Sequence, residues 1–225
     1  MVTLDADETR HLRDVLRLHI DDEVSVFDGI GGEFRCSIFE INKLGSVLTV
    51  LEKTEAASPE SPLEITIAAT VLNGEKYDLI IQKAVELGVV TLIPLQTIRC
   101  DVKTRDAAKR LDRWRRIAME ATKQTGRAKL MEIAEPETFD RLIPRLRGEN
   151  TILFSERDGV DFTTVTPRKK IIALYGPKGG WDDSELEAAS TNGVKIVTLG
   201  GRILRAETAS IAITAILQHR FGDLN

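Results

Sequence analysis

The chain has 225 residues, a formal net charge of −4 at pH 7, 42% hydrophobic residues and 29% charged residues. These values indicate a globular protein of one or two domains and exclude a disordered chain. No run approaches the length of a transmembrane helix, and the acidic beginning is unlike a signal peptide, so we expect a cytoplasmic protein without membrane contact. The two cysteines and three histidines show no metal-ligand spacing, so we expect neither a disulfide framework nor a metal site.

Residues 1–56 are predicted to form a small β-rich domain that begins with a helix. Two runs of alternating apolar and polar residues, "EVSVFDG" and "GEFRCSIFEI", are separated by a glycine-rich turn, which is the pattern of a β-hairpin. The preceding stretch "ETRHLRDVLRLH" predicts a helix with an inward apolar stripe of Leu12, Val15 and Leu16. This domain has six Lys or Arg against twelve Asp or Glu, which argues against RNA binding. The exception is a second stripe on the helix, formed by Arg10, Arg13 and Arg17.

A linker-like stretch, "EAASPESP" at residues 55–62, has two prolines among small polar residues. A second domain is therefore predicted over residues 63–225. Here apolar, β-branched runs such as "LEITIAATV", "KKIIALYG" and "VKIVTLG" alternate with helical patterns. Strands that are apolar on both faces and alternate with helices indicate an α/β fold with a mainly parallel sheet covered on two sides.

Positive charge is concentrated in residues 99–129, where eleven Lys or Arg face four Asp or Glu and leave −11 for the rest of the chain. Such a segment favours an anionic partner, and a solvated helix face is the alternative. The pattern predicts a helix with Trp114 on its buried face, Gly126 at its end and Arg127 just beyond. The candidate RNA-binding residues on its other face are Lys109, Arg113, Arg116 and Lys123.

The predicted binding region lies in the loops that follow "ILF", "ALY" and "VTL", because ligands of open parallel sheets bind beyond the carboxyl ends of the strands. Residues 176–181, "GPKGGW", allow close backbone approach. Residues 199–209, "LGGRILRAETA", place two glycines, two arginines and a glutamate before an apolar helix. Neither a P-loop nor a GxGxxG motif is present, which disfavours nucleotide hydrolysis and hydride transfer. The spacing of these loops does not specify a ligand.

Six stretches together closely resemble the RsmE family: "EKYDLIIQKAVELGV", "IPLQTIRC", "EATKQTGR", "GPKGGW", "LGGRILRAETA" and "ITAILQHRFGDLN". The similarity covers nearly the whole chain in the family's order. Members are SPOUT-class enzymes that use S-adenosylmethionine to methylate N3 of a specific uridine in the 16S ribosomal RNA of the 30S subunit. The resemblance implies a PUA-like N-terminal β-barrel domain, a C-terminal α/β domain tied in a deep trefoil knot (an exception to unthreaded topologies), and a homodimer.

The resemblance also implies which residues form the site. Arg205 and Arg127 are expected to stabilise charge on the uracil or to hold its phosphate, and Glu207 to accept the N3 proton; a structural ion pair at a helix start is the alternative. The implied cofactor-binding residues are Leu174, Gly176, Pro177, Gly179, Gly180, Leu199, Gly200, Ile203, Leu204, Arg205, Thr208 and Ala209. The helix that begins near residue 206 is expected to supply dimer contacts.

This chain departs from the family at one position of the glycine loop. The family usually has GPEGG, and Lys178 replaces the glutamate here. The family also usually has a few more residues before the stretch that matches "DETRHLRDVLRL", which bears on the RNA-binding surface. Two other functions remain open: a non-catalytic RNA-binding ribosome-assembly factor of the same fold, and a SPOUT enzyme that methylates a ribose 2′-hydroxyl.

Overall fold

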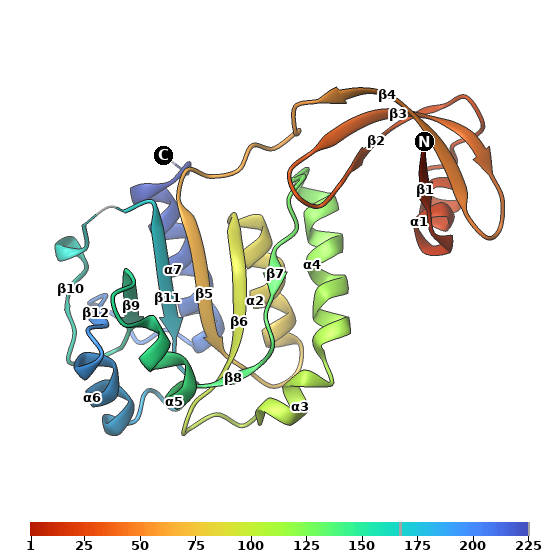
Figure 1. Ribbon diagram of the computed structural model, residues 1–225. Helices are drawn as coiled ribbons and strands as arrows, with labels where there is room; N and C mark the ends of the chain where they lie inside the picture. The colour runs from red at the N-terminus through yellow and green to blue at the C-terminus, as the bar shows by residue number, and fades with distance from the viewer. Residues whose placement is uncertain (167, 225) are drawn as a thin grey trace. The chain divides into compact units, whose positions relative to one another are not determined.

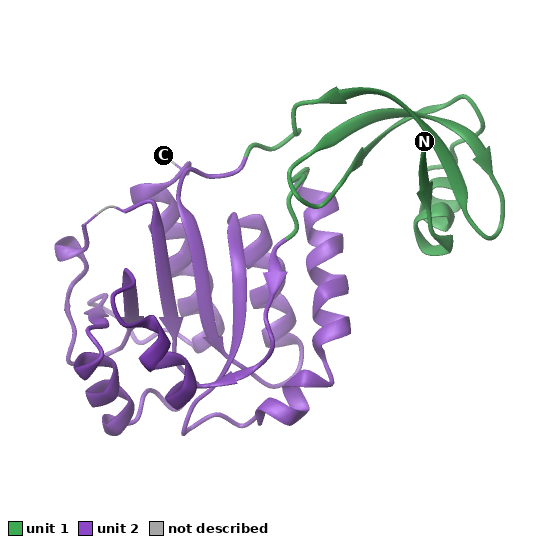
Figure 2. Cartoon of the chain, viewed as in Figure 1, with its two compact units in different colours: residues 1–59, 126–130 green, residues 60–125, 131–225 purple. Residues whose placement is uncertain are grey.

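The computed structural model describes residues 1–166 and 168–224 (Figure 1). It divides the chain into two compact units, Met1–Pro59 with Gly126–Leu130 and Glu60–Thr125 with Met131–Asn225 (Figure 2). The short segment Gly126–Leu130 belongs to the first unit because its backbone pairs with the loop after β2. There, the N–H of Gly31 donates to the carbonyl of Ala128, and the N–H of Leu130 donates to that of Gly29, each at 3.0 Å.

The first unit is a curled antiparallel sheet with one helical segment. Its strands are β1 (Val2–Leu4), β2 (Glu23–Phe27), β3 (Glu33–Ile41) and β4 (Ser46–Thr54), in the order β1-β4-β3-β2. Cys36 and Ile38 alternate inward on β3 and pack with Leu48 and Leu12 in a small core. The turn between β2 and β3 is closed by Asp28, whose carboxylate accepts from two backbone N–H groups of that turn, as the glycine-rich pattern predicts.

The helical segment of this unit differs from its prediction. Helix α1 (Ala6–Arg10) passes into a π-helical turn, His11–Val15. Leu12 is 4% exposed, whereas Val15 and Leu16 are 65% and 48% exposed. The predicted inward stripe is therefore right for Leu12 and wrong for the other two residues. The wider π-helical turn carries the following side chains off the face of Leu12, and Arg17 then turns the chain with a φ of 57°.

The second unit is an α/β domain built on a parallel sheet of order β10-β12-β9-β11-β5-β6-β7, with β8 also paired to β6. Its strands are β5 (Glu64–Thr70), β6 (Val89–Gln96), β7 (Glu132–Ile133), β8 (Glu137–Thr138), β9 (Thr151–Phe154), β10 (Val160–Asp161), β11 (Lys170–Tyr175) and β12 (Lys195–Thr198). Its helices are α2 (Glu75–Glu86), α3 (Thr104–Ala108), α4 (Leu111–Thr125), α5 (Phe139–Leu142), α6 (Asp183–Thr191) and α7 (Ala206–Phe221). The predicted mainly parallel α/β fold is confirmed.

Helices cover both faces of this sheet. On β5, Ile67 and Ala69 belong to a buried cluster with side chains of α2, α4 and α7, whereas Ala68 belongs to a second cluster with α5 and α6. Figure 1 shows α2 and α7 behind the strands and α5 and α6 in front of them. Successive side chains of a strand point to opposite faces, so strands buried on both sides read as continuous apolar runs.

The basic segment forms two helices, α3 and α4, rather than one. Trp114 is 1% exposed and packs on the ring of Tyr77 with centroids 4.7 Å apart, which confirms its predicted place in the core. Gly126, with a φ of 71°, follows the last residue of α4. A left-handed glycine ends a helix at little steric cost, as predicted.

Candidate cofactor cavity

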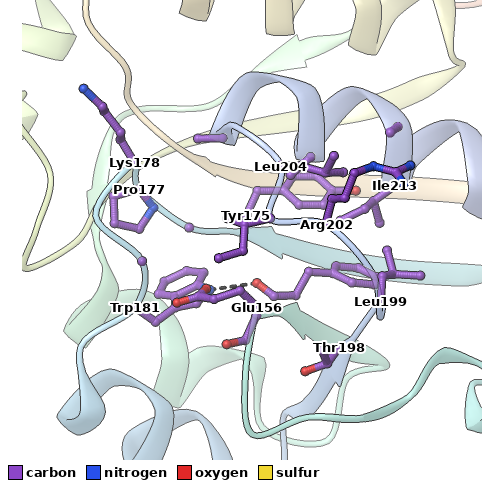
Figure 3. Close-up of a pocket in the computed structure, with 18 of the residues that line it drawn as sticks. Glu156, Tyr175, Pro177, Lys178, Trp181, Thr198, Leu199, Arg202, Leu204 and Ile213 are labelled. Carbon is purple, nitrogen blue, oxygen red and sulfur yellow. Dashed lines mark hydrogen bonds between the residues drawn. The ribbon is translucent and has the colours of Figure 1, made fainter.

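A cavity of about 660 Å³ lies at the carboxyl ends of β9, β11 and β12 (Figure 3). Residues 154–156, 175–181 and 198–204 line it from three loops. One face of α7 completes the wall with Ala206, Ala209, Ala212, Ile213 and Ile216. The three strands are neighbours in the sheet, so their carboxyl ends open on the same place. The prediction that the loops after these strands come together is confirmed.

The glycine loop after β11 contacts neighbours that leave no room for larger residues. A Cβ atom added to Gly176 would lie 2.9 Å from the indole of Trp181, and one added to Gly180 would lie 2.6 Å from Oε1 of Glu156. Gly180 also has a φ of 71°, which side chains rarely adopt. The indole N–H of Trp181 donates to the carbonyl of Phe154 at 2.8 Å, so the loop is anchored to the end of β9 (Figure 3).

Arg99 holds the same loop from the segment after β6. Its guanidinium donates to the carbonyl of Gly179 and to the carboxylate of Asp182, both at 3.1 Å. Asp182 caps α6, and hydrogen bonds from Ser184, with Arg99 adding to them, lower the pKa of its carboxyl. The buried Glu185 completes a capping box with Asp182, a motif that fixes the start of a helix.

Arg157 holds the glycine loop from the segment after β9. Its guanidinium donates to the carbonyl of Trp181 at 3.3 Å and to the carboxylate of Asp183. Arg99 and Arg157 thus each bind one backbone carbonyl of the loop and one carboxylate at the start of α6. Two charge-assisted pairs from separate segments orient the loop backbone before any ligand binds.

The sequence-derived cofactor residues are largely brought together at this cavity. Nine of the twelve line it, from the glycine loop, the loop after β12 and α7. Leu174 is instead fully buried in the core cluster with α5 and α6. Arg205 and Thr208 do not line it either: Arg205 is the N-cap residue of α7 without a side-chain cap, and Thr208 is exposed in the first turn of that helix.

The three sequence-derived catalytic residues lie outside the described lining of the cavity. Glu207 pairs with Lys76 of α2, with the ammonium 3.1 Å from Oε1. Burial alone would raise the pKa of Glu207, but its own backbone N–H, Lys76 and Arg205 hold it below its ordinary value. A carboxylate with a lowered pKa is a weak proton acceptor. Arg127 is 5% exposed and belongs to the first unit.

Several lining residues were not selected from the sequence. Glu156 and Ser155 follow β9, Arg202 follows β12, and Trp181 ends the glycine loop. The strand-end rule that selected the other loops also covers "ILFSER", so it could have named Glu156. The inward face of α7 could have been found from the spacing of its small apolar residues, although the helix is apolar on more than one side.

The RNA-binding candidates fall into two sets on different units. In the first unit, Arg10 pairs with Asp7 at 3.4 Å and Arg13 with Asp14 at 2.6 Å, while Arg17 is exposed beyond the helical segment. On α4 and in the turn before it, basic side chains form ion pairs with acidic neighbours. These pairs are Lys109 with Asp106, Arg113 with Asp78, and Lys123 with Glu120. Arg116 is exposed on α4.

A parallel sheet with a glycine-lined cavity at its carboxyl edge and a small antiparallel domain define a two-domain α/β protein of the ligand-binding type. Residues 59–218 match the model of an RNA methyltransferase domain, and residues 4–51 match that of an RNA methyltransferase PUA domain. A curated relative from Synechocystis, ribosomal RNA small subunit methyltransferase E, is 34% identical over 96% of this chain and 72% of its own. The chain therefore belongs to the RsmE family of RNA methyltransferases.

Solved structures agree with this assignment. Ribosomal RNA small subunit methyltransferase E of Neisseria gonorrhoeae, bound to S-adenosyl methionine, matches with a TM-score of 0.91 and 32% identity over 100% of this chain and 93% of that one. A methyltransferase of Legionella pneumophila in complex with the cofactor SAM matches with a TM-score of 0.90 and 29% identity, covering 99% and 93%. Across residues 1–166 and 168–224, no helix has the length and apolarity to cross a bilayer, and no three metal-ligating side chains cluster.

Proposed function

We propose that this protein transfers the methyl group of S-adenosylmethionine to N3 of a specific uridine in 16S ribosomal RNA of the 30S subunit. The observation that carries the proposal is the glycine-lined cavity at the carboxyl edge of the sheet. It is built by the loops that resemble the family's motifs, and relatives of the same fold are solved with S-adenosylmethionine bound.

The residues of the cavity fit this cofactor. Its volume of about 660 Å³ lies in the range of cofactor sites. Gly176 and Gly180 keep backbone open where a Cβ would collide with neighbouring groups, and the apolar face of α7 offers a surface for an adenine ring. Glu156 supplies a carboxylate toward a ligand that carries positive charge. When bound, S-adenosylmethionine supplies an activated methyl group.

The contribution of the chain itself is mainly positional. Arg99 and Arg157 hold the glycine loop, and Trp181 ties it to β9, so the methyl-donor site is preorganised. Holding two reactants in line and near contact accounts for much of an enzyme's rate gain in such a transfer. Arg202 lines the cavity, and Arg205 is the N-cap residue of α7; both are exposed and are available to stabilise negative charge on the uracil.

The test is incubation of the purified protein with labelled S-adenosylmethionine and either naked 16S rRNA or assembled 30S particles, followed by digestion to nucleosides. Label in 3-methyluridine supports the proposal. Label on a ribose 2′-oxygen identifies the other SPOUT chemistry, and cofactor-free RNA binding without transfer identifies an assembly factor.

The proposal includes the family's knot and dimer. The knot is supported by the resemblance of residues 199–209 to the family's motif and by the match to the family's methyltransferase domain. The dimer is supported by three apolar side chains at the cavity that are exposed in the single chain: Ile203 at 85%, Leu204 at 43% and Ile216 at 37%. A ribosomal RNA substrate supports a cytoplasmic location, which the proposal also includes. Light scattering that shows a monomer at micromolar concentration would contradict the dimer.

A further inference from the structure

We propose that Glu156 is a specificity-determining residue that makes the cavity bind the positively charged methyl donor more tightly than the spent donor. The inference rests on the proposed function, because it concerns how this chain distinguishes S-adenosylmethionine from S-adenosylhomocysteine. These two molecules share the adenosine, the amino group and the carboxylate, and they differ in the methyl group that gives sulfur its positive charge.

The position of Glu156 is set by the glycine loop. Oε1 lies so close to Gly180 that an added Cβ would be 2.6 Å away. The carboxylate therefore rests against the bare backbone of that residue, inside the cavity wall. Glu156 follows β9, which lies between β11 and β12 in the sheet. It lines the cavity together with the loops that follow those two strands and is labelled among the lining residues in Figure 3.

The charge balance of the wall leaves this carboxylate available. Among the described lining residues, three carry a formal charge: Glu156, Lys178 and Arg202. Figure 3 shows the side chain of Lys178 pointing away from the other lining residues. Within the described part of the chain, Glu156 accepts no side-chain or backbone hydrogen bond. Its ion contact, Nε of Arg157 at 4.0 Å, is long for a hydrogen bond.

Arg157 does not neutralise Glu156, because its guanidinium is already engaged. It pairs with Asp158 at 2.7 Å and with Asp183, and it donates to the carbonyl of Trp181. Two carboxylates therefore share the single positive charge of Arg157 before Glu156 is counted. The carboxylate of Glu156 is therefore left without a close cation of its own, and a cationic ligand in the cavity would compensate its charge.

The consequence for binding follows from Coulomb's law. A carboxylate a few ångströms from a sulfonium attracts it even in a partly solvated site, and removing such an attraction changes affinity by about tenfold. Transfer of the methyl group leaves sulfur neutral, so the attraction ends with the reaction. Glu156 thus strengthens binding of the donor and not of the product, and its removal should raise KM for the donor.

The experiment is calorimetric titration of S-adenosylmethionine and S-adenosylhomocysteine into the parent protein, Glu156→Gln and Glu187→Gln. Glu187 is an exposed carboxylate of α6 that does not line the cavity, so its variant controls for net charge. We expect Glu156→Gln to weaken binding of the donor by about tenfold and binding of the product by less than about twofold. The Glu187 variant should behave as the parent for both.

Two results overturn the inference. An equal loss of affinity for both ligands would mean that the carboxylate binds a group that the two ligands share. Unchanged affinities would mean that the carboxylate faces solvent. A second measurement needs no variant: the parent's preference for the donor should fall as salt is raised. If the parent protein binds neither ligand, the proposed function itself is refuted. If the parent methylates rRNA but its preference for the donor changes neither with Glu156→Gln nor with salt, only this inference is refuted.

Discussion

Replacing Gly180 by alanine tests whether the glycine loop acts through close backbone approach. Gly180 combines a φ of 71° with a Cβ position 2.6 Å from Oε1 of Glu156. The left-handed conformation costs a non-glycine residue about 1–2 kcal/mol. The added methyl group must also displace the Glu156 carboxylate or move the loop, because contacts below 3 Å are not sustained. We expect a loss of both stability and cofactor affinity.

Gly193, in the turn between α6 and β12, provides a matched control. Its φ is 80°, and an added Cβ would meet nothing within 4 Å, so Gly193→Ala carries the backbone cost alone. Gly193→Ala should lose about 1–2 kcal/mol of unfolding free energy, which corresponds to roughly 2–8 °C in Tm for a chain of this size, and Gly180→Ala should lose at least as much. Only Gly180→Ala should weaken the binding of S-adenosylmethionine, as measured by calorimetric titration. If Gly180→Ala binds the cofactor as tightly as Gly193→Ala does, the close-approach argument is wrong.

Three further outcomes follow from charge and burial. Burial raises the pKa of both tyrosines, Tyr77 and Tyr175, so their joint contribution to stability should be complete below about pH 10 and be lost above it at up to about 2.7 kcal/mol per pH unit; tyrosinate absorbance that precedes loss of circular dichroism would contradict this. Arg113→Glu with Arg116→Glu should weaken rRNA binding and flatten its salt dependence without changing cofactor affinity. If the double variant binds rRNA as the parent does, the basic face of the helix does not contact RNA and is only solvated. Lys178→Glu should change cofactor affinity by less than about threefold because the side chain points away from the cavity; a tenfold gain in titration would show that the family's glutamate acts on the ligand.

The architecture and the place of the cavity could be predicted because they depend on local patterns. Apolar runs such as "LEITIAATV" identify strands buried on both faces, and the alternation with helices implies parallel pairing. Once the sheet is parallel, the carboxyl ends of adjacent strands must open on one edge. The loops after β9, β11 and β12 could therefore be selected without knowing the ligand. The buried position of Trp114 could likewise be predicted from the helical spacing of its apolar neighbours.

The roles of individual charged residues could not be predicted in the same way. Glu207 pairs with Lys76, which lies on a helix far away in the sequence, and only the fold brings the two together. Arg127 directly follows the basic helix in sequence, but it is buried and belongs to the first unit rather than to the unit of that helix. Its position next to the helix in sequence therefore did not indicate its surroundings. The prediction that Val15 and Leu16 point inward was wrong because a π-helical turn changes the helical period on which the inward stripe depends.

The cavity offers charge and geometry rather than a titrating side chain for the proposed reaction at N3. Its described lining includes neither histidine nor cysteine. The phenol of Tyr175 hydrogen-bonds Thr214, and burial raises its pKa, so it neither gives nor takes a proton near neutral pH. Glu207 stands outside the lining, paired with Lys76 and with its pKa lowered. An effective general base has a pKa near the operating pH, and neither group meets that condition. For the proposed reaction we infer an electrostatic contribution, in which Arg202 at the cavity stabilises the uracil anion and the N3 proton leaves to solvent.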